Sequence, residues 1–284
     1  MVVVGGGGTM GSGIAQVVAQ AGFQVTVVET DDAALERGLQ RIDRGLQRAV
    51  RAGALEGPDA AAAARARIKG STDLEAAAAT ADHVIETVVE VLDVKADVLG
   101  RLDAACRDDV VLASNTSQFS ISRLAAATGR PDRVVGSHWF NPPPVMRLIE
   151  LVRGVETSDE TLATALDLAA RYGKETIVCK KDTQGFVTSR LIALFMVEAA
   201  RIVEEGIADV EDVNKACVLA FNHALGPLDT ADLSGLDVLQ NVADGLVEHY
   251  GERFLVPPGV RSRVNAGHLG RKTGRGFRDY GGTR

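Results

Sequence analysis

The sequence predicts an α/β domain built on a mostly parallel sheet, followed by an all-α domain. The chain opens with a strand, a glycine turn, a helix and a second strand, and strand-like runs then alternate with helical segments as far as Cys179. A strand–helix–strand unit of this kind makes its two strands parallel. After Gly185 only helical patterns follow, so we place a domain boundary there, between residues 1–184 and 185–284.

β-Branched residues and glycines define the opening unit. Met1–Val4 is a short valine run that stops at four glycines, Ile14–Ala21 has a helical pattern, and Phe23–Glu29 is a second strand. The stretch 31–53 carries apolar residues along one helical face, and the alanine-rich stretch 58–68 is a second helix. Together these two stretches predict a helical hairpin inserted after the second strand.

Strands and helices alternate again from residue 82 onward. Short apolar runs predict strands at 82–86, 110–113, 133–138, 147–152 and 175–179, with helices at 92–107, 120–128 and 159–172. The prolines Pro142–Pro144 predict a stiff, extended connection, because proline fixes its own φ and restricts the residue before it. A long helical pattern from Phe186 to Glu205 opens the second domain.

The composition excludes several classes of function. The 284 residues carry a net charge of −7 with a pI of about 5.3, so nucleic acid, which needs a basic surface, is not expected as a partner. No apolar run approaches the roughly 20 residues of a membrane span, and the N-terminus lacks the basic stretch of a signal peptide. Cys106, Cys179 and Cys217 have neither metal nor disulfide spacing, which favours a reduced, cytoplasmic setting without a metal site.

Five arginines gather in the first helix of the predicted hairpin, and two interpretations of them stay open. They form either a solvated helix face or a local binding site for a phosphorylated ligand. The five are Arg37, Arg41, Arg44, Arg48 and Arg51.

The glycine turn has the spacing G-x-G-x-x-G, with Gly6, Gly8 and Gly11 as its glycines. It follows a strand and opens a helix, and Glu29 lies 18 residues after Gly11 at the end of the next strand, which is the context of a dinucleotide-binding fingerprint. The helix N-terminus, with Thr9 and Met10 inside the turn, would hold a pyrophosphate through backbone amides. The alternative is a flexible turn with a surface acid. We therefore expect a Rossmann-type domain that binds NAD, since the charge of Glu29 would repel the 2′-phosphate of NADP.

His138 and Glu150 form a candidate catalytic pair. His138 ends a predicted strand, and Glu150 lies inside the apolar run LIELV. A lone histidine at a strand end is more often structural, but a buried carboxylate needs a partner, and an imidazolium is a natural one. A carboxylate behind an imidazole fixes its tautomer and supports proton abstraction.

The sequence resembles the L-3-hydroxyacyl-CoA dehydrogenase family, in particular its short bacterial 3-hydroxybutyryl-CoA members, over essentially the whole chain. The resemblance implies an NAD-dependent oxidoreductase of fatty acid metabolism that interconverts 3-hydroxyacyl and 3-oxoacyl thioesters and forms a homodimer through the helical domain. The motifs that carry the resemblance are GGGTMGSGIAQVVAQAG, SNTSQFSI, GSHWFNPPPVMRLIELVRG, KDTQGFVTSR, GPLDTADLSGLD and LGRKTGRGF.

The resemblance also implies roles for single residues. His138 matches the histidine that takes or gives the hydroxyl proton, and Glu150 matches the glutamate that orients it. Ser117, in the N-T-S motif, matches a serine that contacts the reacting oxygen and the nicotinamide end of the cofactor, and Ser189 occupies a substrate-site position. Further positions that match the NAD site are Glu90, Lys95, Asn115, Asn141 and Lys272.

Three departures from the family pattern leave more than one class of substrate open. The motif DTQGFVTSR has Gln184 for a proline and Ser189 for an asparagine, and Gln118 replaces the second serine of N-T-S-S. Gly45 and Ala52 stand where coenzyme A-binding members use a serine and a lysine. Alternatives therefore remain: a thioester of a carrier protein, a free hydroxy acid, or a non-catalytic NAD-binding role.

Overall fold

The computed structural model describes residues 1–281. It divides into two compact units, Met1–Thr183 and the chain from Gln184 onward, and each unit is described by itself. The predicted fold class is confirmed: the first unit is an α/β unit on one mixed sheet, and the second consists of helices.

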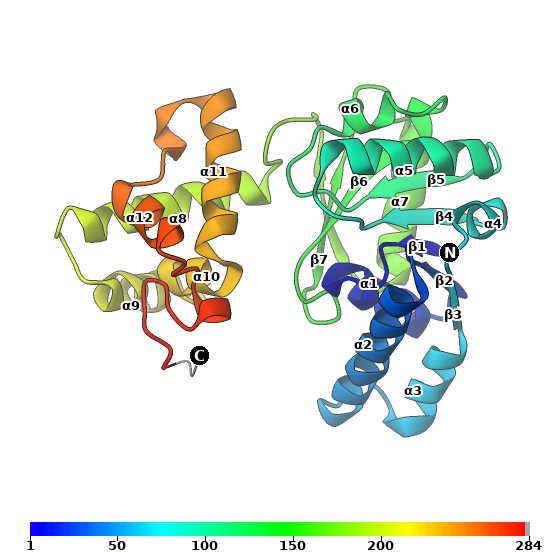
Figure 1. The fold of residues 1–284 in the computed structure, drawn as a ribbon, viewed down its shortest axis with the longest axis horizontal. Coiled ribbons are helices and arrows are strands. Elements are labelled where there is room, and N and C mark those ends of the chain that lie inside the picture. The colour runs from blue at the N-terminus through cyan, green and yellow to red at the C-terminus, as the bar shows by residue number, and fades with distance from the viewer. Residues whose placement is uncertain (282–284) are drawn as a thin grey trace. The chain divides into compact units, whose positions relative to one another are not determined.

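The first unit contains one eight-stranded sheet in the order β3-β2-β1-β4-β5-β6-β7-β8 (Figure 1). All neighbours are parallel except β6 and β7, which are antiparallel. The strand order reverses between β1 and β4, and open α/β sheets bind their ligands outside the carboxyl ends of the strands at such a point. The strands are β1 (Val2–Val4), β2 (Val25–Val28), β3 (Ile68–Ser71), β4 (His83–Glu86), β5 (Val111–Ser114), β6 (Val134–Trp139), β7 (Leu148–Val152) and β8 (Glu175–Cys179).

Helices cover both faces of the sheet. Apolar residues of α1 and α7 pack with valines of the strands in one buried cluster. The hairpin of α2 and α3 adds Ile42, Leu46 and Ala64 to this cluster. α4, α5 and α6 pack against β1, β2, β4, β5 and β6, and Figure 1 shows α5 in front of the strands. The helices are α1 (Thr9–Gln20), α2 (Asp32–Arg51), α3 (Gly57–Ala66), α4 (Leu74–Ala79), α5 (Leu92–Ala105), α6 (Ile121–Ala125) and α7 (Asp159–Arg171).

Two predictions for this unit were wrong. The second hairpin helix ends at Ala66, and Ile68–Ser71 forms the edge strand β3, which pairs with β2 and is followed by α4. Only Ile68 of that strand is buried, so its polar sequence carries no alternating apolar pattern. The prolines do not form an extended connection: Val145 and Met146 both donate backbone hydrogen bonds to Pro142 O, which makes a tight turn between β6 and β7.

The second unit is a helical assembly around its own apolar core. α8 and α11 contribute most of the core residues, among them Val197, Leu239 and Leu246, and Phe254 and Val260 close it. Several large apolar side chains on α8 and α9 remain exposed, including Leu191, Leu219 and Phe221. The α-helices are α8 (Thr188–Glu204), α9 (Val210–Phe221), α10 (Pro227–Ser234), α11 (Leu236–Tyr250) and α12 (Pro258–Asn265).

Candidate active site

The glycine turn joins β1 to α1 and is packed too tightly for side chains. A Cβ at Gly11 would overlap Gly5 O and the Thr87 hydroxyl, and one at Gly6 would overlap the Val27 side chain. α1 has Gly8 as its N-cap, no capping side chain and no acidic residue in its first turn, and Thr9 is its first residue. An uncapped helix N-terminus reached through a glycine turn fits a pyrophosphate, because the amides and the helix dipole both favour an anion.

Glu29 lies at the end of β2, beside this turn. Its carboxylate accepts hydrogen bonds from Gly7 N at 2.6 Å and from Thr30 N at 3.3 Å. Arg41 of α2 donates to Gly7 O, so the hairpin helps to fix the same turn. A fixed negative charge at this position fits the ribose hydroxyls of NAD and opposes a 2′-phosphate. The residues present therefore fit the dinucleotide.

His138 and Glu150 are direct cross-strand partners in the antiparallel pair β6–β7. His138 Nδ1 lies 3.0 Å from a carboxylate oxygen of Glu150, and Glu150 is completely buried. If Nδ1–H donates to the carboxylate, the basic lone pair of the neutral imidazole is on Nε2. The antiparallel reversal after β6 is what brings two residues twelve positions apart in the sequence into this contact.

The turn after β5 lies beside the end of β6. Asn115 Oδ1 accepts a hydrogen bond from Trp139 N at 2.8 Å, and Trp139 directly follows His138. Ser117 lies two residues further along the same turn, and its backbone N–H donates to Glu90 Oε1 at 2.9 Å. The sheet thus gathers these predicted residues at the carboxyl ends of the neighbouring strands β4, β5 and β6.

A cluster of three charged residues underlies this edge of the sheet, and the sequence analysis did not identify one of them, Glu86. Lys95 is only 1 % exposed, and its ammonium lies 2.9 Å from Glu86 and 3.1 Å from Glu90. Glu86 is completely buried and also accepts from the Ser114 hydroxyl at 2.6 Å. The signal in the sequence was a glutamate next to the apolar residues Val84 and Ile85, comparable to Glu150 inside the apolar run LIELV.

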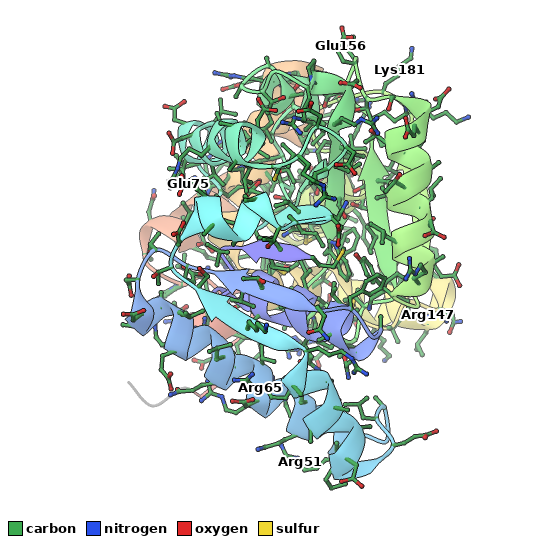
Figure 2. All side chains as sticks on the ribbon, turned by 90° about the vertical axis from the view of Figure 1, so that its right-hand side faces the viewer. Arg51, Arg65, Glu75, Arg147, Glu156 and Lys181 are labelled. Atoms are coloured by element: carbon green, nitrogen blue, oxygen red, sulfur yellow. The ribbon has the colours of Figure 1, made fainter. Side chains whose placement is uncertain are left out.

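A cavity of about 550 Å³ opens beside the glycine turn. α2 contributes Arg41, Arg44 and Arg48 to its lining, and the apolar turn Pro142–Val145 lines it as well. Arg37 and Arg51 belong to the same helix but do not line the cavity, and Figure 2 shows Arg51 at the outer end of the hairpin. The interpretation as a phosphate-binding site fits Arg41, Arg44 and Arg48, which line the cavity. The interpretation as a solvated helix face fits Arg37 and Arg51, which are exposed.

Two of the substituted positions face this cavity. Gly45 and Ala52 both line it, and a Cβ at Gly45 would overlap the amide of Gln16 on α1. Glycine at 45 is thus the residue that lets α1 and α2 approach so closely, and a serine would displace Gln16.

The remaining predicted residues lie elsewhere. Met10 is half-buried against the core of the first unit, and Asn141 is exposed at the start of the proline turn. Ser189 and Lys272 belong to the second unit. Ser189 is buried in the first turn of α8, and Lys272 pairs with Asp237 at 2.6 Å.

The sheet and the glycine turn with Glu29 beside it are those of a dinucleotide-dependent dehydrogenase. Residues 1–183 match the NAD-binding domain of 3-hydroxyacyl-CoA dehydrogenase, and residues 185–280 match its C-terminal domain. The chain belongs to the 3-hydroxyacyl-CoA dehydrogenase family, as its motifs predicted.

Three relatives illustrate the range of this similarity. The chain is 44% identical to a 3-hydroxybutyryl-CoA dehydrogenase of Mycobacterium tuberculosis, covering 98% of both chains. It is 41% identical to the solved (S)-3-hydroxybutyryl-CoA dehydrogenase PaaH1 of Ralstonia eutropha, with a TM-score of 0.93 over 99% of this chain and 98% of that one. It is 33% identical to an NAD⁺-dependent 5-formyl-3-hydroxy-2-methylpyridine 4-carboxylic acid 5-dehydrogenase, with a TM-score of 0.79 over 98% and 90%.

Proposed function

We propose that this protein interconverts a 3-hydroxyacyl-CoA and its 3-oxoacyl form by hydride transfer with NAD, using His138 as general base and acid. The observation that carries the proposal is the 3.0 Å contact between His138 and the buried Glu150, beside the N-T-S turn, in a chain that matches both domains of the family. Bound NAD supplies the hydride acceptor, and the chain's own residues supply orientation and proton transfer.

In the oxidative direction, neutral His138 takes the proton of the 3-hydroxyl at Nε2. Positive charge grows on the imidazole as it does so, and the Glu150 carboxylate on Nδ1 stabilises that charge in a site shielded from water. In reduction the imidazolium returns the proton to the oxygen. The hydroxyl of Ser117 donates to the same oxygen.

The arginine-lined cavity supports coenzyme A as the carrier. Arg41, Arg44 and Arg48 offer cationic donors to phosphate groups, while the turn Pro142–Val145 offers an apolar surface to the chain that links phosphate to thioester. The turn closely follows β6, which carries His138 near its end, so we expect a substrate held at the turn to present its thioester end to His138. The arginines thereby take over from the serine and lysine that Gly45 and Ala52 replace.

We also propose a homodimer in the cytoplasm, with a role in fatty acid metabolism. Leu191 on α8 and Leu219 and Phe221 on α9 are 63–73% exposed, an apolar surface that a second copy would cover. The three cysteines are free and buried, in keeping with a reducing compartment. No helix within residues 1–281 has the length and apolar character to cross a bilayer.

The test is a substrate panel with purified protein and NADH. Oxidation of NADH with acetoacetyl-CoA supports the proposal. Activity on free oxo acids alone would instead support a hydroxy acid dehydrogenase, an alternative that the similarity to the pyridine carboxylic acid dehydrogenase favours. Binding of NADH without turnover of any thioester or free acid would support the non-catalytic role and overturn the proposal.

A further inference from the structure

We infer that Lys174 is a positioning residue of the substrate site: its ammonium fixes the proline turn that lines the arginine cavity, and it thereby sets the affinity for the acyl thioester. The turn runs from Pro142 to Met146, between β6 and β7. The inference rests on the proposed function in one respect, namely that this cavity holds the carrier end of the substrate.

The backbone of Lys174 is itself firmly held. It follows the end of α7, where Gly173 has a φ of +73°. The backbone N–H of Gly173 donates to Ala170 O at 2.9 Å, and that of Lys174 donates to Ala169 O at 3.0 Å, which is the Schellman pattern of a helix end. β8 begins at the next residue. Helix and strand therefore both fix the point from which the Lys174 side chain extends.

The ammonium of Lys174 binds the turn at two places. It donates to the carbonyl oxygen of Pro143 at 2.7 Å and to that of Met146 at 2.6 Å. Hydrogen bonds from a charged donor are stronger than those between neutral groups. The ammonium also lies 5.8 Å from the centre of the Trp139 ring, within the range of a cation–π contact. Lys174 thus joins the middle of the turn to its end.

The turn needs such support because its own backbone supplies few hydrogen bonds. Its prolines have no N–H to donate, and the N–H groups of Val145 and Met146 share one acceptor, Pro142 O, at 2.9 and 3.0 Å. Pro143 also packs against α1, since a Cβ at Gly13 would lie only 2.9 Å from its Cδ. α1 and Lys174 therefore both fix Pro143, which lines the cavity.

The catalytic pair does not depend on Lys174 in the same way. His138 faces Glu150 inside the β6–β7 ladder, and the next pair, Trp139 with Ile149, lies between this contact and the turn. The backbone hydrogen bonds of the ladder hold His138 without help from the ammonium. Loss of Lys174 should therefore weaken substrate binding and leave proton transfer intact.

The experiment uses the full-length variant Lys174→Met, which removes the ammonium donors and keeps the apolar stem. We expect amide exchange at Val145 and Met146 to become about tenfold faster, because the turn opens more often. The Kd of acetoacetyl-CoA, measured by calorimetry, should weaken about tenfold, since the turn must then be ordered on binding, while kcat stays within about twofold of wild type. Acetoacetyl-pantetheine should lose affinity by the same factor, because the turn contacts the linking chain and not the phosphates. Lys174→Arg keeps the charge and the donors and should restore most of the affinity.

The matched control is Arg147→Gln/Glu175→Gln, which removes an ion pair of 3.5 Å between the residue before β7 and the first residue of β8. Both side chains are exposed, and Figure 2 shows Arg147 at the surface. Exposed ion pairs contribute little to stability, so we expect exchange, both Kd values and kcat to stay at the wild-type values.

Unchanged exchange in Lys174→Met would mean that the ammonium does not fix the turn. Faster exchange with an unchanged Kd of acetoacetyl-CoA would mean a structural role only, and a lower kcat with an unchanged Kd would mean a role in the chemistry. Each of these results overturns the inference. Exchange and calorimetry do not require turnover, so failure of the proposed function would be visible separately, as absence of turnover in wild type.

Discussion

Glu29 should decide the choice of cofactor. Its carboxylate is fixed by Gly7 N at 2.6 Å at the end of β2, where the adenosine ribose would bind. We expect kcat/KM with NADH to exceed that with NADPH clearly, and Glu29→Ala to weaken NADH binding about tenfold, since a hydrogen bond to a charged group contributes about 1.5–3 kcal/mol. Comparing the two cofactors in steady-state assays measures this. A wild-type preference for NADPH would refute the assignment of Glu29.

Ser189 should set the acyl preference. An asparagine amide both donates and accepts, whereas serine is shorter and carries one rotating hydroxyl. A serine in place of the family's asparagine should leave room for a substituted or hydroxylated acyl group, and we therefore expect slow turnover of acetoacetyl-CoA. Ser189→Asn should raise kcat/KM for acetoacetyl-CoA and lower it for the bulkier thioester. If the variant matches wild type on both, the position has no role in specificity.

His83 should make stability sensitive to acid. It is buried in β4, its Nδ1 has no hydrogen-bond partner among the described residues, and burial lowers the pKa of its imidazole to about 4. The unfolded chain protonates this imidazole near pH 6.5, whereas the folded protein does not. The contribution of His83 to the free energy of unfolding is therefore fully present above pH 6.5 and is lost as the pH falls toward 4. At pH 5 the loss is about 2 kcal/mol. Urea unfolding of His83→Leu should show a correspondingly smaller loss between pH 7 and pH 5, and an identical loss would contradict this account.

At the scale of elements, α2 should contribute the carrier site. Arg44→Gln/Arg48→Gln should raise KM for a CoA thioester about tenfold or more, because charged contacts to phosphate are lost. A pantetheine thioester, which lacks the nucleotide, should be affected much less. The control is Arg37→Gln/Arg51→Gln on the same helix, outside the cavity. Equal effects of the two double variants would show that the helix acts only through its overall charge.

The elements also show where sequence reasoning succeeds and where it stops. β1, α1 and β2 were predictable because a valine run, glycines and an acid leave one arrangement for a dinucleotide turn. The contact of His138 with Glu150 was predictable as chemistry, since a buried carboxylate needs a partner. β3 was not predictable from the sequence, because an edge strand with one buried residue has no periodic signal. The cavity was not predictable either, because it depends on how α2 packs beside the proline turn.

At the scale of the whole molecule, the helical unit should mediate self-association. Leu219 and Phe221 on α9 are 73% and 63% exposed, which is unfavourable for a monomer in water. We expect a dimer in light scattering at micromolar concentration, and Leu219→Glu/Phe221→Glu should give a folded monomer. Val155→Glu, at an exposed valine of the first unit, is the control and should remain dimeric. A monomeric wild type would contradict the proposal.

The most direct test of the central claim, that His138 transfers the proton, compares His138→Ala with wild type in acetoacetyl-CoA reduction and in NADH binding. A general acid or base contributes on the order of 10²–10⁴-fold, so kcat should fall by at least about 100-fold while the Kd of NADH stays near the wild-type value. Glu150→Gln should lower kcat in the same direction, since it acts through the imidazole at 3.0 Å. A His138→Ala enzyme with near wild-type kcat would contradict the account.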